Sequence, residues 1–139
     1  MKQPRIENVE EIAIAVKDMG QAIAVFKELF GFGFETGWDM PHEKMRVRSE
    51  RIAGVQFQLL ESTSPDGVIA KFIEGRGEGI HHIAFRVSHL EEMVAQLKNK
   101  GVKFIPEKPV DMPSLSYIFI HPKSAQGILI ELIEEKRAS

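Results

Sequence analysis

The chain has 139 residues and a formal net charge of -2, and hydrophobic residues make up 43 % of it. A chain of this length can bury the core of one compact domain. Lys and Arg are neither in excess nor clustered, which argues against a nucleic-acid partner. No apolar run approaches the roughly 20 residues that a membrane span needs. The chain contains no cysteine, which excludes disulfides and favours a cytoplasmic protein.

The chain contains an internal repeat that begins with a predicted strand. Apolar residues alternate with small or polar ones over residues 9–16, and the pattern returns over residues 80–87, about 71 positions later. Predicted helices follow both strands. Asp18 with Gln21 has the spacing of a helix N-cap and its returning third residue, and Ser88 with Glu91 repeats that spacing. Each helix is expected to end at a glycine: Gly31, Gly101.

Each repeat also ends in a similar way. Residues 55–61 resemble residues 128–134, and both segments have the composition of strands. Between helix and last strand there is room for two more strands, with candidates at 46–52 and 116–121. The prediction is therefore an α+β protein made of two βαβββ modules. We expect a single domain over 1–139, with module one at 6–61, a linker at 62–79 and module two at 80–134.

Four polar side chains occupy matching places in the two repeats. Glu11 and His82 lie at equivalent positions in the two first strands, and Gln58 and Glu131 do so in the two last strands. A pseudo-two-fold axis between the modules would bring all four together. This set of oxygen and nitrogen donors suits a divalent transition metal, and the lack of sulfur ligands argues against a structural zinc site. Each residue alone has an ordinary structural explanation, so the prediction depends on their symmetry.

The neighbour of His82 receives a different interpretation. His81 is adjacent in the same predicted strand, so its side chain should point to the opposite face. We expect it to have a structural role or to support the metal ligands from behind.

Three segments carry a family resemblance: residues 79–85, 121–124 and 127–132. With further matches from about residue 6 to 134, they resemble methylmalonyl-CoA epimerases. These enzymes belong to the vicinal oxygen chelate superfamily, together with lactoylglutathione lyases and bleomycin-resistance proteins. The resemblance implies paired βαβββ modules in an open, cup-shaped mixed sheet with helices on the outside. It also implies a divalent metal ion, most often cobalt, with manganese, nickel, zinc or magnesium accepted.

The resemblance extends to the metal ligands. His82, Gln58 and Glu131 match ligand positions of the family, and Glu11 stands where the family usually has a histidine. A carboxylate in place of imidazole adds negative charge and favours harder cations such as manganese or magnesium. The same change is compatible with a different substrate or with a lost metal site.

The activity that the resemblance implies is epimerisation of methylmalonyl-CoA, or of a similar 2-substituted acyl-CoA. The enzyme removes the α-proton and forms a metal-stabilised enolate. Inversion needs proton carriers on opposite faces of the α-carbon. We predict Glu131 for one face and Glu43 for the other, with His42 as the alternative to Glu43.

Two other functions remain open from the sequence. One is a different glyoxalase-type metal-dependent isomerase or lyase. The other is a non-catalytic protein that binds small molecules, as in drug resistance, and Glu11 in place of histidine favours this alternative. The expected partners are an acyl-CoA and a second copy of the chain in a homodimer, as in related modules, with no nucleic acid and no membrane.

Overall fold

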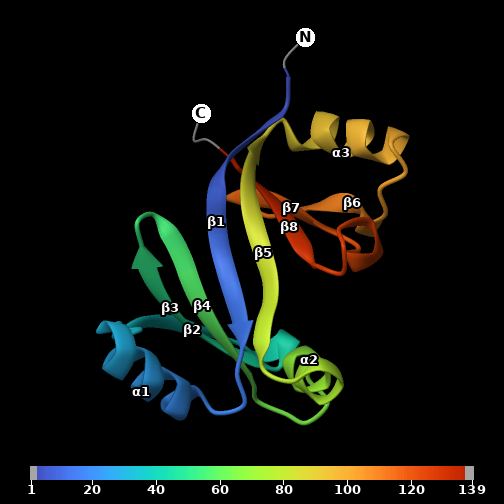
Figure 1. Ribbon diagram of the computed structural model, residues 1–139. Coiled ribbons are helices and arrows are strands. Elements are labelled where there is room, and N and C mark those ends of the chain that lie inside the picture. Colours follow the sequence, from blue (N-terminus) through green and yellow to red (C-terminus); the bar gives the residue numbers. More distant parts are fainter. Residues whose placement is uncertain (1–2, 137–139) are drawn as a thin grey trace. The chain divides into compact units, whose positions relative to one another are not determined.

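The computed structural model describes residues 3–136, and its strands form one open mixed sheet (Figure 1). The elements are β1 (Arg5–Ala15), α1 (Met19–Phe30), β2 (Thr36–Met40), η1 (Pro41–Glu43), β3 (Met45–Ile52), β4 (Val55–Ser62), α2 (Val68–Arg76), β5 (Gly79–Ser88), α3 (Leu90–Asn99), β6 (Phe104–Asp111), β7 (Leu115–Ile120), η2 (Pro122–Ser124) and β8 (Ile130–Glu135). The strand order is β2-β3-β4-β1-β5-β8-β7-β6. No helix within residues 3–136 is long and apolar enough to cross a membrane.

The order of these elements confirms the predicted α+β class and the repeated unit. The run β1-α1-β2-β3-β4 is followed by α2 and then by β5-α3-β6-β7-β8. In each run the first strand pairs in parallel with the last one, β1 with β4 and β5 with β8. The predicted linker contains a short helix, α2, between the two runs.

The chain divides into two compact units whose boundary falls within β1 and β5. The first unit consists of Glu11–His81, and the second comprises the described residues 3–10 and 82–136. The start of β1 therefore belongs with the second half of the chain. The linear module boundaries at 6–61 and 80–134 stay a prediction.

Both faces of the sheet in the first unit are covered by helices. On one face α1 packs against a cluster that includes Leu59 and a group of phenylalanines. On the other face, α2 packs through Ile69 against Val47 and Leu60, which are register partners. Full burial of each such side chain stabilises the fold by about 1.5–3 kcal/mol. Because side chains alternate along a strand, Gln58, two residues before Leu60, also lies on the α2 face. The phenylalanines are Phe26, Phe32, Phe34 and Phe57.

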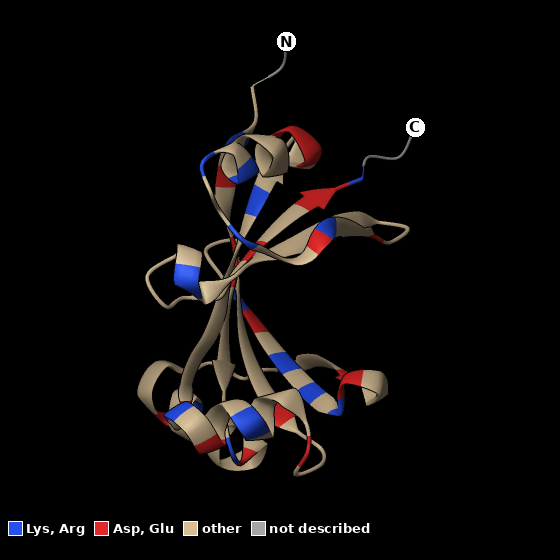
Figure 2. Cartoon of the chain, turned by 90° about the vertical axis from the view of Figure 1, so that its right-hand side faces the viewer, with Lys and Arg blue, Asp and Glu red and all other residues tan. Residues whose placement is uncertain are grey.

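The charges on β3 follow the same alternation, and Figure 2 shows basic and acidic residues along this strand. Arg46 forms an ion pair with Glu61 at 3.1 Å, and Arg48 lies 3.9 Å from Asp39. These arginines alternate with Val47, which is buried on the α2 face. Arg46, Arg48 and Glu50 therefore lie on the face away from Gln58, whereas Arg51 shares the face of Val47 and Gln58.

Helix α1 begins and ends as predicted. The Asp18 side chain accepts a hydrogen bond from the Gln21 backbone N–H at 3.0 Å. At the other end Gly31 adopts a left-handed conformation, with φ of 77°, which a glycine takes without strain.

The predicted cap of α3 is wrong. Ser88 is the last residue of β5, and its hydroxyl accepts a hydrogen bond from the Arg5 N–H at 3.2 Å. The N-cap position is His89, and no side-chain cap is formed there. The Glu134 carboxylate accepts the backbone N–H groups of His89 and Leu90 instead, each at 3.0 Å. A strand residue far away in the chain thus replaces the local cap.

In the second unit, α3 covers only one face of the sheet. Leu90, Met93 and Val94 of α3 pack against Ile118 of β7 and Leu132 of β8. Glu131 precedes Leu132 in the same strand, so its side chain lies on the face opposite α3.

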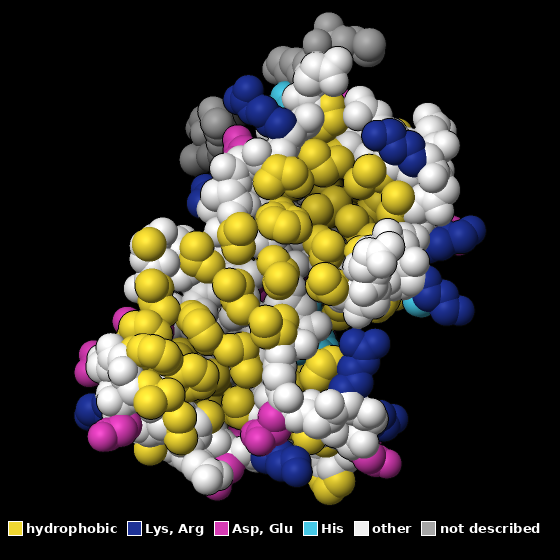
Figure 3. Space-filling view, viewed as in Figure 1, with side chains coloured by type: hydrophobic (Ala, Val, Ile, Leu, Met, Phe, Trp, Pro, Cys, Tyr) yellow, Lys and Arg dark blue, Asp and Glu magenta, His cyan; other side chains and the backbone are white. Residues whose placement is uncertain are grey.

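Large apolar side chains also remain exposed in both units. Figure 3 shows hydrophobic side chains gathered on the viewed face of the protein. Exposed apolar groups of this size often mark binding surfaces. The exposed examples include Val25, Leu29, Phe30, Trp38, Met40, Ile105 and Met112.

Candidate metal centre

The first unit holds two of the four predicted ligands on one face of its sheet. In the parallel pair of β1 and β4, Glu11 is the register partner of Gln56, and Ala13 is the partner of Gln58. Because side chains alternate, Glu11, Gln56 and Gln58 point to the same face. Ser49 of β3 is the register partner of Gln58 on its other side.

Hydrogen bonds hold the Gln58 side chain against its neighbours on this face. Gln58 is buried, with 5 % of its surface exposed. Its Nε2 donates to Oε1 of Gln56 at 3.0 Å. The Ser49 hydroxyl donates to the same oxygen at 3.3 Å. The Gln58 amide is therefore held by neighbours on β4 and β3.

The second unit holds the other two predicted ligands in a matching arrangement. Ala84 of β5 is the register partner of Glu131 on β8, just as Ala13 is the partner of Gln58. His82 stands two residues before Ala84, as Glu11 stands two residues before Ala13. The registers thus confirm that the two pairs occupy equivalent positions in the repeats.

His82 and Glu131 face each other in a largely buried environment. His82 Nε2 lies 3.6 Å from Glu131 Oε1, and the two side chains are 10 % and 13 % exposed. The distance exceeds that of a direct hydrogen bond. The Phe119 ring lies edge-on to the His82 ring, with 5.8 Å between the ring centroids. An imidazole and a carboxylate therefore stand together beside an aromatic ring.

His82 and Glu131 offer two ligand atoms for a metal ion in the second unit, and Glu11 offers a carboxylate in the first unit. Imidazole nitrogen with carboxylate oxygens is a donor set that divalent manganese, iron, cobalt and zinc accept. The residues present thus fit a divalent metal ion.

The remaining predicted residues lie elsewhere. The His81 ring lies edge-on to Phe72, with 4.9 Å between the centroids, in agreement with a structural role. Glu43 and His42 are exposed on η1, just before β3. Met45, at the start of β3, is four residues from Ser49, the partner of Gln58, which corresponds to about 13 Å along the strand.

Comparison with known proteins identifies the family of this chain. The model of the Glyoxalase/Bleomycin resistance protein/Dioxygenase superfamily matches residues 10–120. The chain belongs to this superfamily. Its βαβββ repeats are thus those of a family member, as the sequence motifs indicated.

Individual proteins are also similar to the chain. A hypothetical protein from Bacillus halodurans C-125 has a TM-score of 0.84 and 32 % identity, over 99 % of each chain. Methylmalonyl-CoA epimerase from Mycobacterium tuberculosis has a TM-score of 0.81 and 31 % identity, over 95 % of this chain and 90 % of that one. The mitochondrial methylmalonyl-CoA epimerase of Homo sapiens is 29 % identical over 126 residues, which are 89 % of this chain and 72 % of the human protein.

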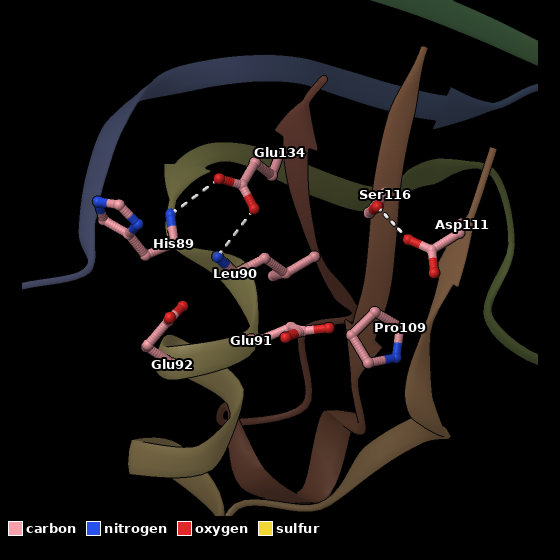
Figure 4. Close-up of a pocket in the computed structure, with 8 residues that line it drawn as sticks. All are labelled: His89, Leu90, Glu91, Glu92, Pro109, Asp111, Ser116 and Glu134. Atoms are coloured by element: carbon pink, nitrogen blue, oxygen red, sulfur yellow. Dashed lines mark hydrogen bonds between the residues drawn. The ribbon is translucent and has the colours of Figure 1, made fainter. Parts of the chain in front are cut away.

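A further pocket in the second unit has a structural explanation. Figure 4 shows this pocket, of about 180 Å³, at the start of α3. Both carboxylate oxygens of Glu134 accept N–H groups of the helix. Asp111 is hydrogen-bonded to Ser116, and this contact, with Lys136 nearby, lowers the pKa of Asp111. These two acidic groups therefore already have partners within the protein.

Sequence reasoning did not single out Gln56 and Ser49. The signal for Gln56 is its position two residues before Gln58, because alternate residues of a strand share a face. Ser49 has no comparable signal, since only the register of β3 against β4 brings it beside Gln58.

Proposed function

We propose that this protein is a metal-dependent epimerase that interconverts the two epimers of methylmalonyl-CoA or of a similar 2-substituted acyl-CoA. The facing pair of His82 and Glu131 in the second unit is the observation that carries the proposal. It occurs in a chain that is similar over most of its length to two methylmalonyl-CoA epimerases. A cytoplasmic location is part of the same proposal.

The proposed ligands are Glu11, Gln58, His82 and Glu131. They would hold a divalent ion, with cobalt first and manganese, nickel, zinc or magnesium as alternatives. When bound, such an ion acts as a Lewis acid toward the carboxylate and thioester oxygens of the substrate. Gln58 contributes a neutral oxygen to a set that already has two carboxylates, which limits the negative charge at the site.

The chain itself would supply the proton transfers. Glu131 is proposed to take the α-proton on one face of the substrate. Its side chain is only 13 % exposed, so a bound substrate rather than bulk water would meet it. Glu43 is proposed for the opposite face and His42 is its alternative. Both are exposed on η1, where a substrate can reach them.

A homodimer is the proposed assembly. Trp38, Met40 and Phe30 are among the large apolar side chains that stay exposed. Figure 3 shows hydrophobic groups gathered on the viewed face. Such surfaces gain free energy when a partner removes them from water.

Proton NMR of methylmalonyl-CoA in deuterium oxide tests the proposed activity. Protein loaded with cobalt should remove the α-proton signal much faster than the thioester exchanges by itself, and excess chelator should abolish the effect. Unchanged exchange with the loaded protein would contradict the epimerase. Metal uptake without exchange would then favour another metal-dependent isomerase or lyase, whereas no uptake would favour the non-catalytic binding protein.

A further inference from the structure

Three polar side chains of the first unit form a short chain of hydrogen bonds. Oε1 of Gln56 accepts from Gln58 Nε2 at 3.0 Å and from the Ser49 hydroxyl at 3.3 Å. Ser49 and Gln58 are both buried, with 7 % and 5 % of their surface exposed. Buried polar groups of this kind stay hydrogen-bonded because an unpaired one costs about 1–3 kcal/mol.

The direction of these hydrogen bonds decides which end of the Gln58 amide is available to a ligand. A glutamine has an NH2 group at one end and an acceptor oxygen at the other. Because Nε2 of Gln58 is bonded to Gln56, its oxygen is left for a ligand. A metal ion binds the oxygen of a glutamine and is repelled by the NH2 group. The orientation observed is thus the one that a metal ligand needs.

The opposite direction is also geometrically consistent by itself. With both amides turned over, Gln56 would donate to Gln58, and the Ser49 hydroxyl would accept. Arg51, the register partner of Gln56 on β3, donates to the Gly54 backbone oxygen at 2.9 Å. The charged neighbour on β1 therefore distinguishes the two arrangements. Glu11 is the register partner of Gln56, and side chains of register partners lie on the same face of a sheet about 4.8 Å apart.

An ionised carboxylate accepts hydrogen bonds and cannot donate them. In the observed direction both donors meet the Gln56 oxygen, which leaves the Gln56 NH2 group for its other surroundings. In the turned direction the Gln56 oxygen would stand in the row with the Glu11 carboxylate, and the two acceptors would repel each other. The carboxylate of Glu11 therefore favours the direction that presents the Gln58 oxygen.

We infer that Gln56 is a positioning residue of the proposed metal centre. The charge of Glu11 sets the orientation of the Gln56 amide, which in turn holds the Gln58 amide with its oxygen toward the ion. Ser49 supports it by donating to the same oxygen. The inference rests on the proposed function, because it concerns the same site. It also gives the carboxylate at position 11 a second effect, besides direct binding: through Gln56, it sets the orientation of another ligand.

Cobalt affinity tests this role with three variants. Gln56→Leu keeps a side chain of similar size and removes the amide, and Ser49→Ala removes only the hydroxyl. Gln96→Leu is the matched control, since Gln96 is exposed on α3. Groups that orient a metal ligand typically change affinity by 10–100-fold. We expect a Kd for Co²⁺ about 10–100-fold higher in Gln56→Leu and ~5-fold higher in Ser49→Ala, with no change in Gln96→Leu.

The side-chain amide of Gln58 gives a second readout that needs no metal. In ¹⁵N-labelled metal-free protein, one proton of this amide should exchange slowly with water. Its signal is identified by its loss in Gln58→Glu. In Gln56→Leu that proton should exchange as fast as those of exposed glutamines, because its acceptor is gone. If Gln56→Leu unfolds, Ser49→Ala carries the affinity test, since it removes fewer contacts.

The two proposals fail in different ways. Wild-type protein that binds no Co²⁺ would overturn the metal centre and with it the metal-directed role of Gln56. Wild-type protein that binds Co²⁺ together with a Gln56→Leu variant of equal affinity would overturn the positioning role alone. An unchanged Gln58 amide signal in Gln56→Leu would overturn it as well.

Discussion

Glu61 and Glu134 occupy equivalent places in the two βαβββ repeats, and each binds the start of the helix in its own repeat. Glu61 Oε2 accepts the backbone N–H of Met19 at 2.7 Å, and Glu134 accepts the N–H groups of His89 and Leu90. A carboxylate at a helix N-terminus satisfies N–H groups that have no partner within the helix, and it interacts favourably with the helix dipole. In each repeat, a hydrogen bond thereby links the last strand to the start of that repeat's own helix, α1 or α3.

Replacing Glu134 should destabilise the second unit. Glu134→Ala leaves two N–H groups at the start of α3 without their charged acceptor, so we expect the free energy of unfolding to fall by about 2 kcal/mol. Glu107→Ala, an exposed carboxylate on β6, is the control and should change it by less than about 0.5 kcal/mol. Urea unfolding followed by circular dichroism measures both. Equal stabilities of the two variants would show that the contact contributes nothing.

The exposed turn before α2 contains a carboxylate with a shifted pKa. Hydrogen bonds from Lys44 and Ser64 lower the pKa of Asp66 from 3.8 to about 2. Because the folded pKa is lowered, the interaction is fully present above pH 4 and is lost as the pH falls toward 2. Carbon NMR of the carboxyl group should give a midpoint of about 2 in the wild type. In Lys44→Met the midpoint should rise toward 3.8, and an unaltered midpoint would rule out this cause.

Position 11 should control which metal the site prefers. Glu11→His replaces a carboxylate by an imidazole, and imidazole suits cobalt, nickel and zinc better than manganese or magnesium. We expect the ratio of the Kd for Mn²⁺ to the Kd for Co²⁺ to rise by about tenfold or more. Calorimetric titration of both ions into wild type and variant measures this ratio. A constant ratio would indicate that Glu11 does not touch the ion.

Glu43 should affect turnover without affecting metal binding. Glu43→Gln removes the proposed proton carrier for one face of the substrate, so the rate should fall by about 10²–10⁴-fold while the Co²⁺ affinity stays unchanged. His42→Asn is the parallel variant and should keep its rate. The reverse result, with loss of turnover in His42→Asn only, would transfer the role to His42. Full turnover in both variants would exclude η1 from the proton transfer.

Much of the fold could be predicted because its signals are local or repeated. The cap at Asp18 and the stop at Gly31 depend on residues within a few positions, and both are confirmed. The equivalence of the two ligand pairs followed from the repeat and is confirmed by the strand registers. A repeated unit must bury the same positions twice, so a pattern that is ambiguous once becomes informative when it returns.

The errors and omissions concern contacts between segments that are far apart in the chain. Ser88 has the local spacing of a helix cap, but Glu134, 45 residues after His89, takes the N–H groups instead. Ser49 lies beside Gln58 only because β3 pairs with β4. Glu11 and Glu131 belong to different repeats, and their role in binding a metal stays a prediction.

The most direct test is therefore a titration of the metal-free wild-type protein with Co²⁺, followed by visible absorption. If Glu11, Gln58, His82 and Glu131 hold a divalent ion, the cobalt bands should shift and intensify until one ion is bound per chain. His82→Ala should remove this effect. A spectrum that stays that of aqueous cobalt at every ratio would contradict the metal centre and the epimerase mechanism that depends on it.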